Sequence, residues 1–539
     1  MISSNLSLHQ RTLRAPRENG AILAEPPLVE IGGLVAENLQ LRQQQEHYDV
    51  QGRTLGDLSR LARQELLRDA RRWTAAYRDL PPAATSRPEQ LFLAGHQPQL
   101  FHPGVWFKNF ALGHLAKRHG AVGVNLVIDS DTIKTAALRV PSASGDGLHA
   151  AWVPLDQSSE PIPYEERKIR SRGMFADFAA RVMQQLGGLV PDALLRSYWP
   201  LAVQRARQTD NLGACLAQSR HQLEGRWGLE TLEVPQSRVF QSESFAHLAA
   251  HLLAQLPRFR TVYNEAVQEY RDVHGIRGAA QPVPDLAAEG EWLEAPFWIW
   301  TAADPIRRPL FARRQGKEIR LTDHHRLNLS LPLSAEGDAA RAVARLLEIS
   351  CRGVKLRGRA LVTTLWSRLA LGDVFLHGIG GAKYDQVTDA IIERFFGLRP
   401  PGFAVVSATL LLPGANGPDS AESLRAIDRR LRDLTWNPQR CLEGDDQQSG
   451  SMPQELLAAK RRWIETPATS ERARTRCHEI RRINEALQPW VTAQRQQLLA
   501  ERQRTARRLR MSQVLAWREY GFCLYPEGPL REFLTGIRG

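Results

Sequence analysis

The stretch from residue 91 to residue 131 constrains the fold more than any other part of the chain. Residues 91–94 are apolar and end at Gly95, which predicts a short buried strand. Residues 108–119 predict a helix, and residues 122–128 predict a second buried strand. A helix between two strands is typical of parallel neighbours in one sheet. We therefore expect an α/β protein with a parallel sheet.

The turn after the first of these strands is the richest candidate site. It runs from Gly95-His96-Gln97-Pro98 to Lys108, and ligands of open parallel sheets bind where strands end and helices begin. His96 and His102 are candidate catalytic residues, because their ring donors can neutralise charge on a phosphoryl group. The residues expected to bind the ligand are Gly95, Gln97, Gly104 and Lys108. The alternative is a structural turn that Gly and Pro shape and that the histidines cap.

Two acids after the second strand, Asp129 and Asp131, are further candidate catalytic residues. Paired acids at the end of a strand can orient a substrate amine, hold Mg²⁺ or hydrogen-bond a ribose. The alternative is an N-cap for the segment that follows, which Ser and Asp often provide. The residues alone do not decide between these roles.

A second glycine-rich segment, from Gly378 to Asp385, follows another expected strand and opens a helix. Its glycine spacing and the lack of a Lys-Ser or Lys-Thr pair exclude a Walker loop. The backbone N–H groups of such a turn can still bind an anion. The residues expected to contribute are Gly378, Gly380, Gly381, Lys383 and Tyr384. A tight strand-to-helix turn is the alternative, and His377 before it is expected to be a core residue. We expect the two glycine-bearing turns to meet over one pocket.

The basic composition fits an anionic small molecule as well as a nucleic acid, and the distribution of the basic residues bears on the choice. The chain has 71 Lys and Arg residues against 58 Asp and Glu residues. The basic residues are dispersed, and the densest run, between Arg502 and Arg510, has the spacing of a solvated helix face. Only eight of the basic residues are Lys, so Lys108 and Lys383 stand out as compact charges inside motifs. Nucleic-acid binding is not expected.

The pattern of apolar, polar and charged residues in the rest of the sequence suggests how the chain is divided into domains. We expect an N-terminal arm and helices at residues 1–88, a sheet core at 89–415 with an inserted subdomain at about 150–358, a helical arm at 416–518 and a docking segment at 519–539. Local patterns predict a helix over 36–78, a strand over 360–365, a polar stretch at 443–451, an amphipathic coiled-coil helix over 470–510 and a docking strand over 520–526. Packing is the favoured explanation of the Trp-rich residues 292–300, with a pocket wall as the alternative.

Two further expectations concern metals and location. The five cysteines are scattered, which predicts free thiols rather than disulfides or a zinc site, and no other metal site is evident. No apolar run is long enough for a membrane span, and the N-terminus lacks the apolar stretch of a secretory signal. These features predict a cytoplasmic protein.

Two segments resemble a known family, the bacillithiol-biosynthesis cysteine-adding enzymes. Gly95 to Gly104, with Lys108 after it, resembles that family's Gly-Gln-Gln-x-x-Leu-Phe-x-Gly-Pro segment, with His96 in place of the first Gln. Gly378 to Tyr384, with Val405 to Thr409 later, resembles the family's Gly-Pro-Gly-Glu-x-x-Tyr and Pro-Arg-x-Ser segments, without the Glu. The His-Gln-Pro part of the first segment is also similar to a bacterial surface-polysaccharide family.

The resemblance to the cysteine-adding enzymes implies both a fold and an activity. The implied fold is a Rossmann-like core related to class I nucleotidyltransferases, with an inserted subdomain and a coiled-coil arm that forms a homodimer. The implied activity is that of a ligase that joins cysteine, or another amino acid, to an amino-sugar or similar amine with ATP and Mg²⁺, in low-molecular-weight thiol biosynthesis. The alternatives are a non-catalytic dimeric scaffold that keeps the fold and, third, an RNA-binding protein.

Overall fold

The computed structural model describes residues 13–81, 90–133, 135–144, 147–158, 160–415, 420–442, 453–467 and 472–537. The chain divides into two compact units. Unit 1 comprises Met1–Val140, Trp152–Leu410 and Arg518–Gly539, and unit 2 comprises Pro141–Ala151 and Leu411–Trp517. Among the described residues, no helix combines the length and the apolar character that crossing a bilayer requires.

A six-stranded, largely parallel sheet forms the centre of unit 1. Its order is β1-β14-β13-β2-β3-β6, and β1 alone runs antiparallel to its neighbour. The strands are β1 (Ile22–Glu25), β2 (Leu91–His96), β3 (Val122–Val127), β6 (Thr231–Pro235), β13 (Val374–His377) and β14 (Ala404–Ala408). Every residue of β3, β6, β13 and β14 is buried, as expected for parallel strands that are covered on both faces. The expectation of a mixed α/β fold with a parallel sheet is therefore confirmed.

The order of these strands places the carboxyl ends of β2 and β13 at the topological switch point of the sheet. From β2 the chain adds β3 and then β6 on one side, and it later adds β13 and then β14 on the other side. The carboxyl ends of β2 and β13 therefore flank the position at which the winding direction reverses. In open α/β sheets this topological switch point leaves a crevice in which ligands bind.

The two helices that leave this point begin differently. Helix α3 (Pro103–His119) follows β2, and its N-cap residue His102 accepts a hydrogen bond from the Gly104 N–H through Nδ1, at 3.1 Å. Gly120, in the left-handed conformation with φ 62°, ends α3 and turns the chain into β3. Helix α13 (Ile379–Ile391) follows β13, and no side chain caps its first turn. A π-helical turn, Ile392–Phe396, ends that segment before β14.

A second sheet in unit 1 is antiparallel, with the order β11-β10-β9-β8-β12 and β7 beside β8. Its strands are β7 (Ala288–Glu289), β8 (Trp292–Thr301), β9 (Arg308–Gln315), β10 (Glu318–Thr322), β11 (Asn328–Pro332) and β12 (Val354–Gly358). Buried side chains of this sheet share one apolar core with those of the central sheet. A separate two-stranded sheet pairs β4 (Ala137–Ser144) with β5 (Gly147–Pro154).

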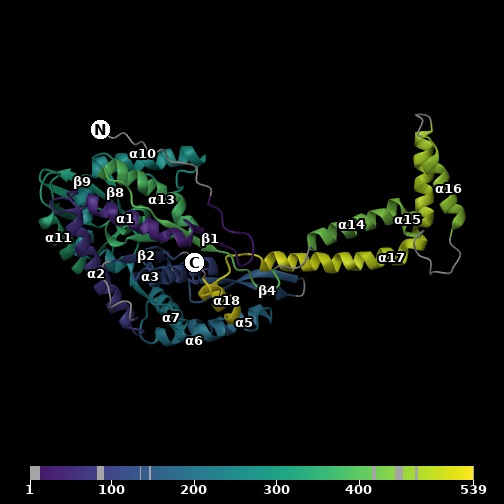
Figure 1. The fold of residues 1–539 in the computed structure, drawn as a ribbon, viewed down its shortest axis with the longest axis horizontal. Coiled ribbons are helices and arrows are strands. Elements are labelled where there is room, and N and C mark those ends of the chain that lie inside the picture. Colours follow the sequence, from purple (N-terminus) through teal and green to yellow (C-terminus); the bar gives the residue numbers. More distant parts are fainter. Residues whose placement is uncertain are drawn as a thin grey trace. The chain divides into compact units, whose positions relative to one another are not determined.

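Helices surround these sheets (Figure 1). Besides α3 and α13, the helices of unit 1 are α1 (Ile31–Gln45), α2 (Leu55–Ala75), α4 (Arg172–Ala176), α5 (Phe178–Leu186), α6 (Leu195–Ala206), α7 (Leu212–Arg226), α8 (Gln236–Val239), α9 (Glu243–Ala254), α10 (Leu256–His274), α11 (Ala340–Cys351), α12 (Ala360–Trp366) and α18 (Glu527–Thr535). The range expected as an inserted subdomain, about 150–358, supplies β6 to the central sheet and also supplies every strand of the antiparallel sheet.

Three local predictions are wrong, each for a physical reason. The helix expected over 36–78 is two helices, because the chain turns at Gln51 and Gly52, which have φ of 54° and 90°. The strand expected over 360–365 is helix α12, since periodicity does not separate a short apolar run in a strand from one in a buried helix. The docking strand expected over 520–526 is a buried 3₁₀ turn, Phe522–Leu524. The polar stretch expected at 443–451 lies outside the described residues.

Unit 2 contains the long C-terminal helix that the sequence predicts. Its helices are α14 (Ser420–Trp436), α15 (Pro438–Leu442), α16 (Gln454–Glu465) and α17 (Ala473–Leu515), and α14 lies alongside α17 (Figure 1). Ile427 and Leu434 of α14 pack on Val491 and Leu498 of α17. Leu498 is 5% exposed, whereas its neighbour Leu499 is 49% exposed.

Leu498→Asp and Leu499→Asp form a matched pair that tests this packing. Leu498→Asp buries an unpaired carboxylate and removes an apolar contact, so we expect it to destabilise unit 2 by about 3–5 kcal/mol. Leu499→Asp changes an exposed position and should have an effect within about 0.5 kcal/mol. Scanning calorimetry and circular dichroism measure both effects, and equal losses in the two variants would contradict the packing.

Candidate functional site

A cavity of about 890 Å³ opens in unit 1 at the carboxyl ends of the central strands. This volume lies in the upper part of the range for small-molecule sites, about 300–1,000 Å³. The first turn contributes Gly95, His96, Gln97, His102, Gly104 and Lys108 to its wall, and the second contributes Gly378, Gly380, Gly381, Lys383 and Tyr384. Asp131 also lines it, but Asp129 does not. The two turns therefore share one cavity, as the sequence predicts.

His96 and His102 present opposite hydrogen-bonding groups to this cavity. The ring Nδ1 of His96 lies 3.1 Å from the Gln97 carbonyl, an acceptor, so this nitrogen carries the proton and Nε2 keeps a lone pair. In His102 the Nδ1 atom accepts from the Gly104 N–H, so the proton is on Nε2. Burial lowers the pKa of His96 to about 3 and that of His102 to about 4, with nearby cations contributing in both cases. Both rings are thus neutral at pH 7, His96 as an acceptor and His102 as a donor.

Lys108 is buried beneath the same turn, with only 3% of its surface exposed. Its ammonium group donates a hydrogen bond to the Gly95 carbonyl. Burial, and then the positive charge of Arg220, lower the pKa of Lys108 to about 7. An anion that entered the cavity would favour the charged form of Lys108.

Gln97, Asp131 and Arg307 connect the first turn to the antiparallel sheet. The Gln97 amide donates to Asp131 Oδ2 at 3.0 Å, and Arg307 donates to Asp131 Oδ1 at 3.0 Å. Arg307 lies over the Trp298 ring at 4.6 Å from its centroid, and Arg359 lies over the same ring at 4.1 Å. Asp131 is therefore held as a carboxylate acceptor at the cavity wall.

Asp129 has a different environment, although it stands two residues before Asp131. Its carboxylate accepts the Ser237 N–H at 2.8 Å and the Ser237 hydroxyl at 2.5 Å, and it is 8% exposed. Burial, and then the charge of Glu165, raise the pKa of Asp129 to about 7. The geometry assigns Asp129 to fixing the turn between β6 and α8, so its expected catalytic role is not supported.

The glycines of the two turns serve different purposes. A Cβ atom at Gly104 would lie 2.0 Å from the Ala408 carbonyl oxygen, so the start of α3 can approach β14 only with glycine there. At Gly378 and Gly380 no described atom would lie within 4 Å of a Cβ, and neither residue has a positive φ. Neither packing nor backbone strain therefore requires glycine at these two positions, where the open side of α13 faces the cavity.

Sequence reasoning missed several residues of the wall. Among the described residues, the cavity is lined by the predicted Lys108 and Lys383 and also by Arg14, Arg307, Arg359 and Arg518, against two acids, Asp131 and Glu519. Arg14 and Arg518 come from opposite ends of the chain, and no local pattern singled them out. Trp298 also lines the cavity, whereas Trp300 is 1% exposed. The Trp-rich stretch thus supplies both a wall residue and a packing residue.

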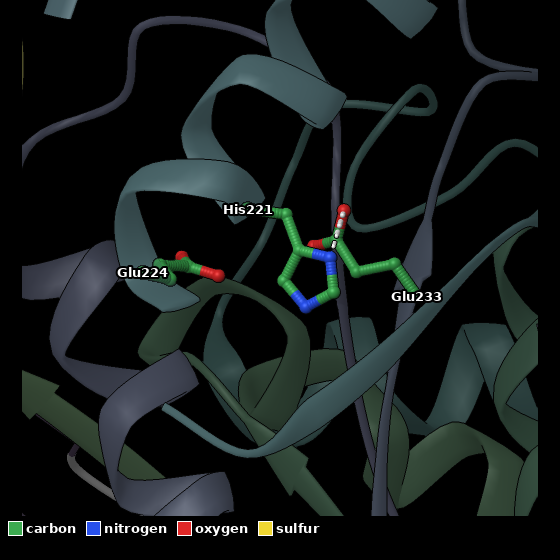
Figure 2. A group of neighbouring side chains, drawn as sticks. All are labelled: His221, Glu224 and Glu233. Carbon is green, nitrogen blue, oxygen red and sulfur yellow. Dashed lines mark ion pairs between the residues drawn. The ribbon is translucent and has the colours of Figure 1, made fainter. Parts of the chain in front are cut away.

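A buried group of His221, Glu224 and Glu233 (Figure 2) has the composition of a metal site. The guanidinium group of Arg220 lies between the two carboxylates, at 2.6 Å from Glu224 and 2.5 Å from Glu233. Both nitrogens of His221 already have partners, the Tyr77 hydroxyl at 2.6 Å and the Thr231 carbonyl at 3.0 Å. A divalent cation would have to displace these groups, so the residues fit a buried ion network and not a metal site.

Neither the comparison with protein-family models nor the comparison with curated proteins finds a match to this sequence.

Asp129→Asn tests the structural assignment through the pH dependence of stability. The folded pKa of Asp129, about 7, lies above the ordinary value of 3.8, so the folded state holds the proton more tightly. Its contribution to stability is greatest below pH 3.8 and declines as the pH rises to about 7, by roughly 4 kcal/mol at most. Calorimetric melting at pH 5 and pH 8 should show the wild type losing stability relative to Asp129→Asn at the higher pH. A pH-independent difference would contradict the assignment.

Proposed function

We propose that unit 1 is a nucleotide-dependent ligase that activates a carboxylate and transfers it to an amine. The observation that carries this proposal is the meeting of two glycine-bearing turns in one cation-rich cavity at the switch point between β2 and β13. The reversal of winding in the strand order β6-β3-β2-β13-β14 supports a Rossmann-like core as part of this proposal, and such a core favours a nucleotide ligand. The excess of Lys and Arg on the wall favours an anionic ligand of this kind.

The phosphate groups are proposed to bind at the first turn of α13. The N–H groups of an uncapped helix N-terminus attract anions, and Gly378 and Gly380 leave room for close approach. Lys383 is exposed beside this turn and forms no hydrogen bond or ion pair with the residues that the structure describes. ATP fits this arrangement, with Mg²⁺ carried on its phosphates, since the wall itself offers few acids.

The first turn is proposed to act on the reacting groups. The Nε2–H of His102 donates to an oxygen on which charge develops, and Lys108 becomes charged as that anion binds. Asp131, with Gln97, orients the amine, and the Nε2 lone pair of His96 accepts a hydrogen bond from substrate. His96 therefore acts as an acceptor, in contrast to the donor role that the sequence suggests.

The identity of the substrates rests on the family resemblance alone. Following it, we propose that cysteine or another amino acid is joined to an amino-sugar or similar amine in the biosynthesis of a low-molecular-weight thiol, in the cytoplasm. A homodimer through the helical arm belongs to the same proposal. The exposed side chains of Trp490 and Leu499 are available for such a contact, whereas Leu498 is already covered within unit 2.

His102→Asn separates the proposed donor role from the N-cap role of His102. Asn caps a helix well but lacks the Nε2–H, so this variant should keep its melting temperature and lose about a hundredfold in turnover. His102→Ala should lose turnover to the same degree and also about 1 kcal/mol of stability. Turnover is measured as ATP-dependent hydroxamate formation with each of the twenty amino acids. Full activity in His102→Asn would contradict the donor role.

Gly380→Ala tests the phosphate site, with Gly33→Ala as its matched control. Both glycines are helical and have open space at the Cβ position, but only Gly380 lines the cavity. Both variants should fold with a stability within about 1 kcal/mol of the wild type. Only Gly380→Ala should weaken ATP binding, by about tenfold or 1.4 kcal/mol.

The shift in melting temperature on adding Mg·ATP, titrated for the wild type and both variants, measures this binding. Equal ATP affinity in Gly380→Ala and Gly33→Ala would contradict the proposal that the phosphates bind at the first turn of α13. The lack of any shift in the wild type would contradict the proposal of nucleotide binding.

A further inference from the structure

His377 is the last residue of β13, and it lines the cavity although it is only 4% exposed. Its ring lies between two aromatic rings, with centroids 4.5 Å from Phe375 and 5.0 Å from Phe403. A Cβ atom at Gly381 would lie 2.8 Å from Nδ1 of His377, so glycine at 381 makes room for the ring. The position of the imidazole is therefore fixed from three sides.

A buried carboxylate lies behind this imidazole. Oδ2 of Asp385, on α13, is 2.9 Å from Nε2 of His377, and Asp385 is fully buried. Arg368 forms an ion pair with the same oxygen at 2.8 Å. Burial would raise the pKa of Asp385, but the charge of Arg368, followed by that of His377, holds it well below its usual range. Asp385 is thus an anion at neutral pH.

The anion determines which ring nitrogen of His377 is protonated. The contact between Nε2 and Oδ2 is an ion-pair contact without the alignment of a hydrogen bond. A carboxylate beside Nε2 still favours a proton on Nε2 and leaves the lone pair on Nδ1, whereas the Asp of hydrolase triads fixes the tautomer from the Nδ1 side. Within the described part of the chain, Nδ1 has no hydrogen-bond partner, and it lies on the side of Gly381 at the cavity wall. His377 therefore offers a basic nitrogen to a ligand in the cavity.

We propose that His377, positioned by Asp385, is the general base that takes a proton from the attacking amine. This inference rests on the proposed function. The amine nitrogen forms a bond to the activated acyl carbon, and the bond from that carbon to the phosphate-bearing oxygen breaks, with the electron pair leaving on that oxygen. The proton of the amine moves to Nδ1 of His377, and the imidazolium that results is stabilised by Asp385.

His96 is the competing base in the same cavity, and its surroundings disfavour the role. Its Nδ1 bonds a neutral carbonyl, and among the described residues no carboxylate forms a hydrogen bond or ion pair with its ring. Lys108 and Arg220 disfavour a positive charge on His96, in addition to the effect of burial. A base must hold the proton during the reaction, and of these two rings only that of His377 lies beside a carboxylate.

Hydroxylamine distinguishes activation of the carboxylate from transfer to the amine. It is largely unprotonated at pH 7, so it captures an activated acyl group without help from a base. The assay supplies the protein with Mg·ATP and each of the twenty amino acids, and with either glucosamine or hydroxylamine as the acceptor. His377→Asn should lower amide formation with glucosamine at least about a hundredfold while hydroxamate formation stays within about threefold of the wild type. His47→Asn, the same change at an exposed histidine, should alter neither reaction.

The outcomes of this assay separate the two proposals. A wild type that forms no hydroxamate with any amino acid contradicts the proposed function. A wild type that forms hydroxamate, together with a His377→Asn variant that transfers to glucosamine at the normal rate, overturns the role of His377. A His377→Asn variant that loses both reactions while it keeps its melting temperature and Mg·ATP binding also overturns it.

A second measurement does not depend on substrates or on the folding of variants. Nitrogen-15 spectra of histidine-labelled wild-type protein at pH 7 report which ring nitrogen of each histidine carries the proton. We expect His377 to be protonated on Nε2 and unprotonated on Nδ1. A proton on Nδ1 in the wild type would overturn the inference.

Discussion

The buried guanidinium group of Arg220 is the interaction on which the candidate site depends. It bridges Glu224 of α7 and Glu233 of β6, and its centre lies 5.6 Å from the ring of Phe101 in the first turn. Trp106, on α3, donates to the same Glu224 at 2.5 Å. Helix α3, helix α7 and the edge of the sheet are thereby joined beneath the turn that carries His96 and Lys108. Removing Arg220 would leave two buried carboxylates without the guanidinium that they share, which is far more costly than the net gain from the intact network.

The positive charge of Arg220 also affects the protonation of residues in the turn above it. Arg220 lowers the pKa of both His96 and Lys108, in each case in addition to burial. The deep part of the cavity is therefore close to neutral before a ligand binds. Arg307 and Lys383 supply positive charge at more exposed parts of the wall. An anionic ligand would be attracted first by the outer cations, and its own charge would then favour protonation of Lys108.

Features encoded by neighbouring residues were predictable from the sequence. The apolar runs of β2 and β3, the helix between them and the glycine at its end all follow from local rules, and so does the placement of the site at the ends of parallel strands. Helix α12 was not predictable, because its apolar run has no distinct period. The wall residues Arg307 and Arg518 were not predictable either, because only tertiary folding brings them to the turns that the sequence identifies.

The more instructive limit is that identical residue types carry different roles at nearby positions. Asp129 and Asp131 look equivalent in sequence, yet one carboxylate is buried on Ser237 and the other lies at the cavity wall. Gly104 is needed because α3 approaches β14 there, whereas Gly380 has no neighbour that a Cβ would meet. Where contacts within the protein require glycine, no ligand is needed to explain the residue. Where they do not, a bound ligand is one explanation of the glycine. By this criterion Gly378 and Gly380 are stronger indications of a bound anion than the more conspicuous glycines of the first turn.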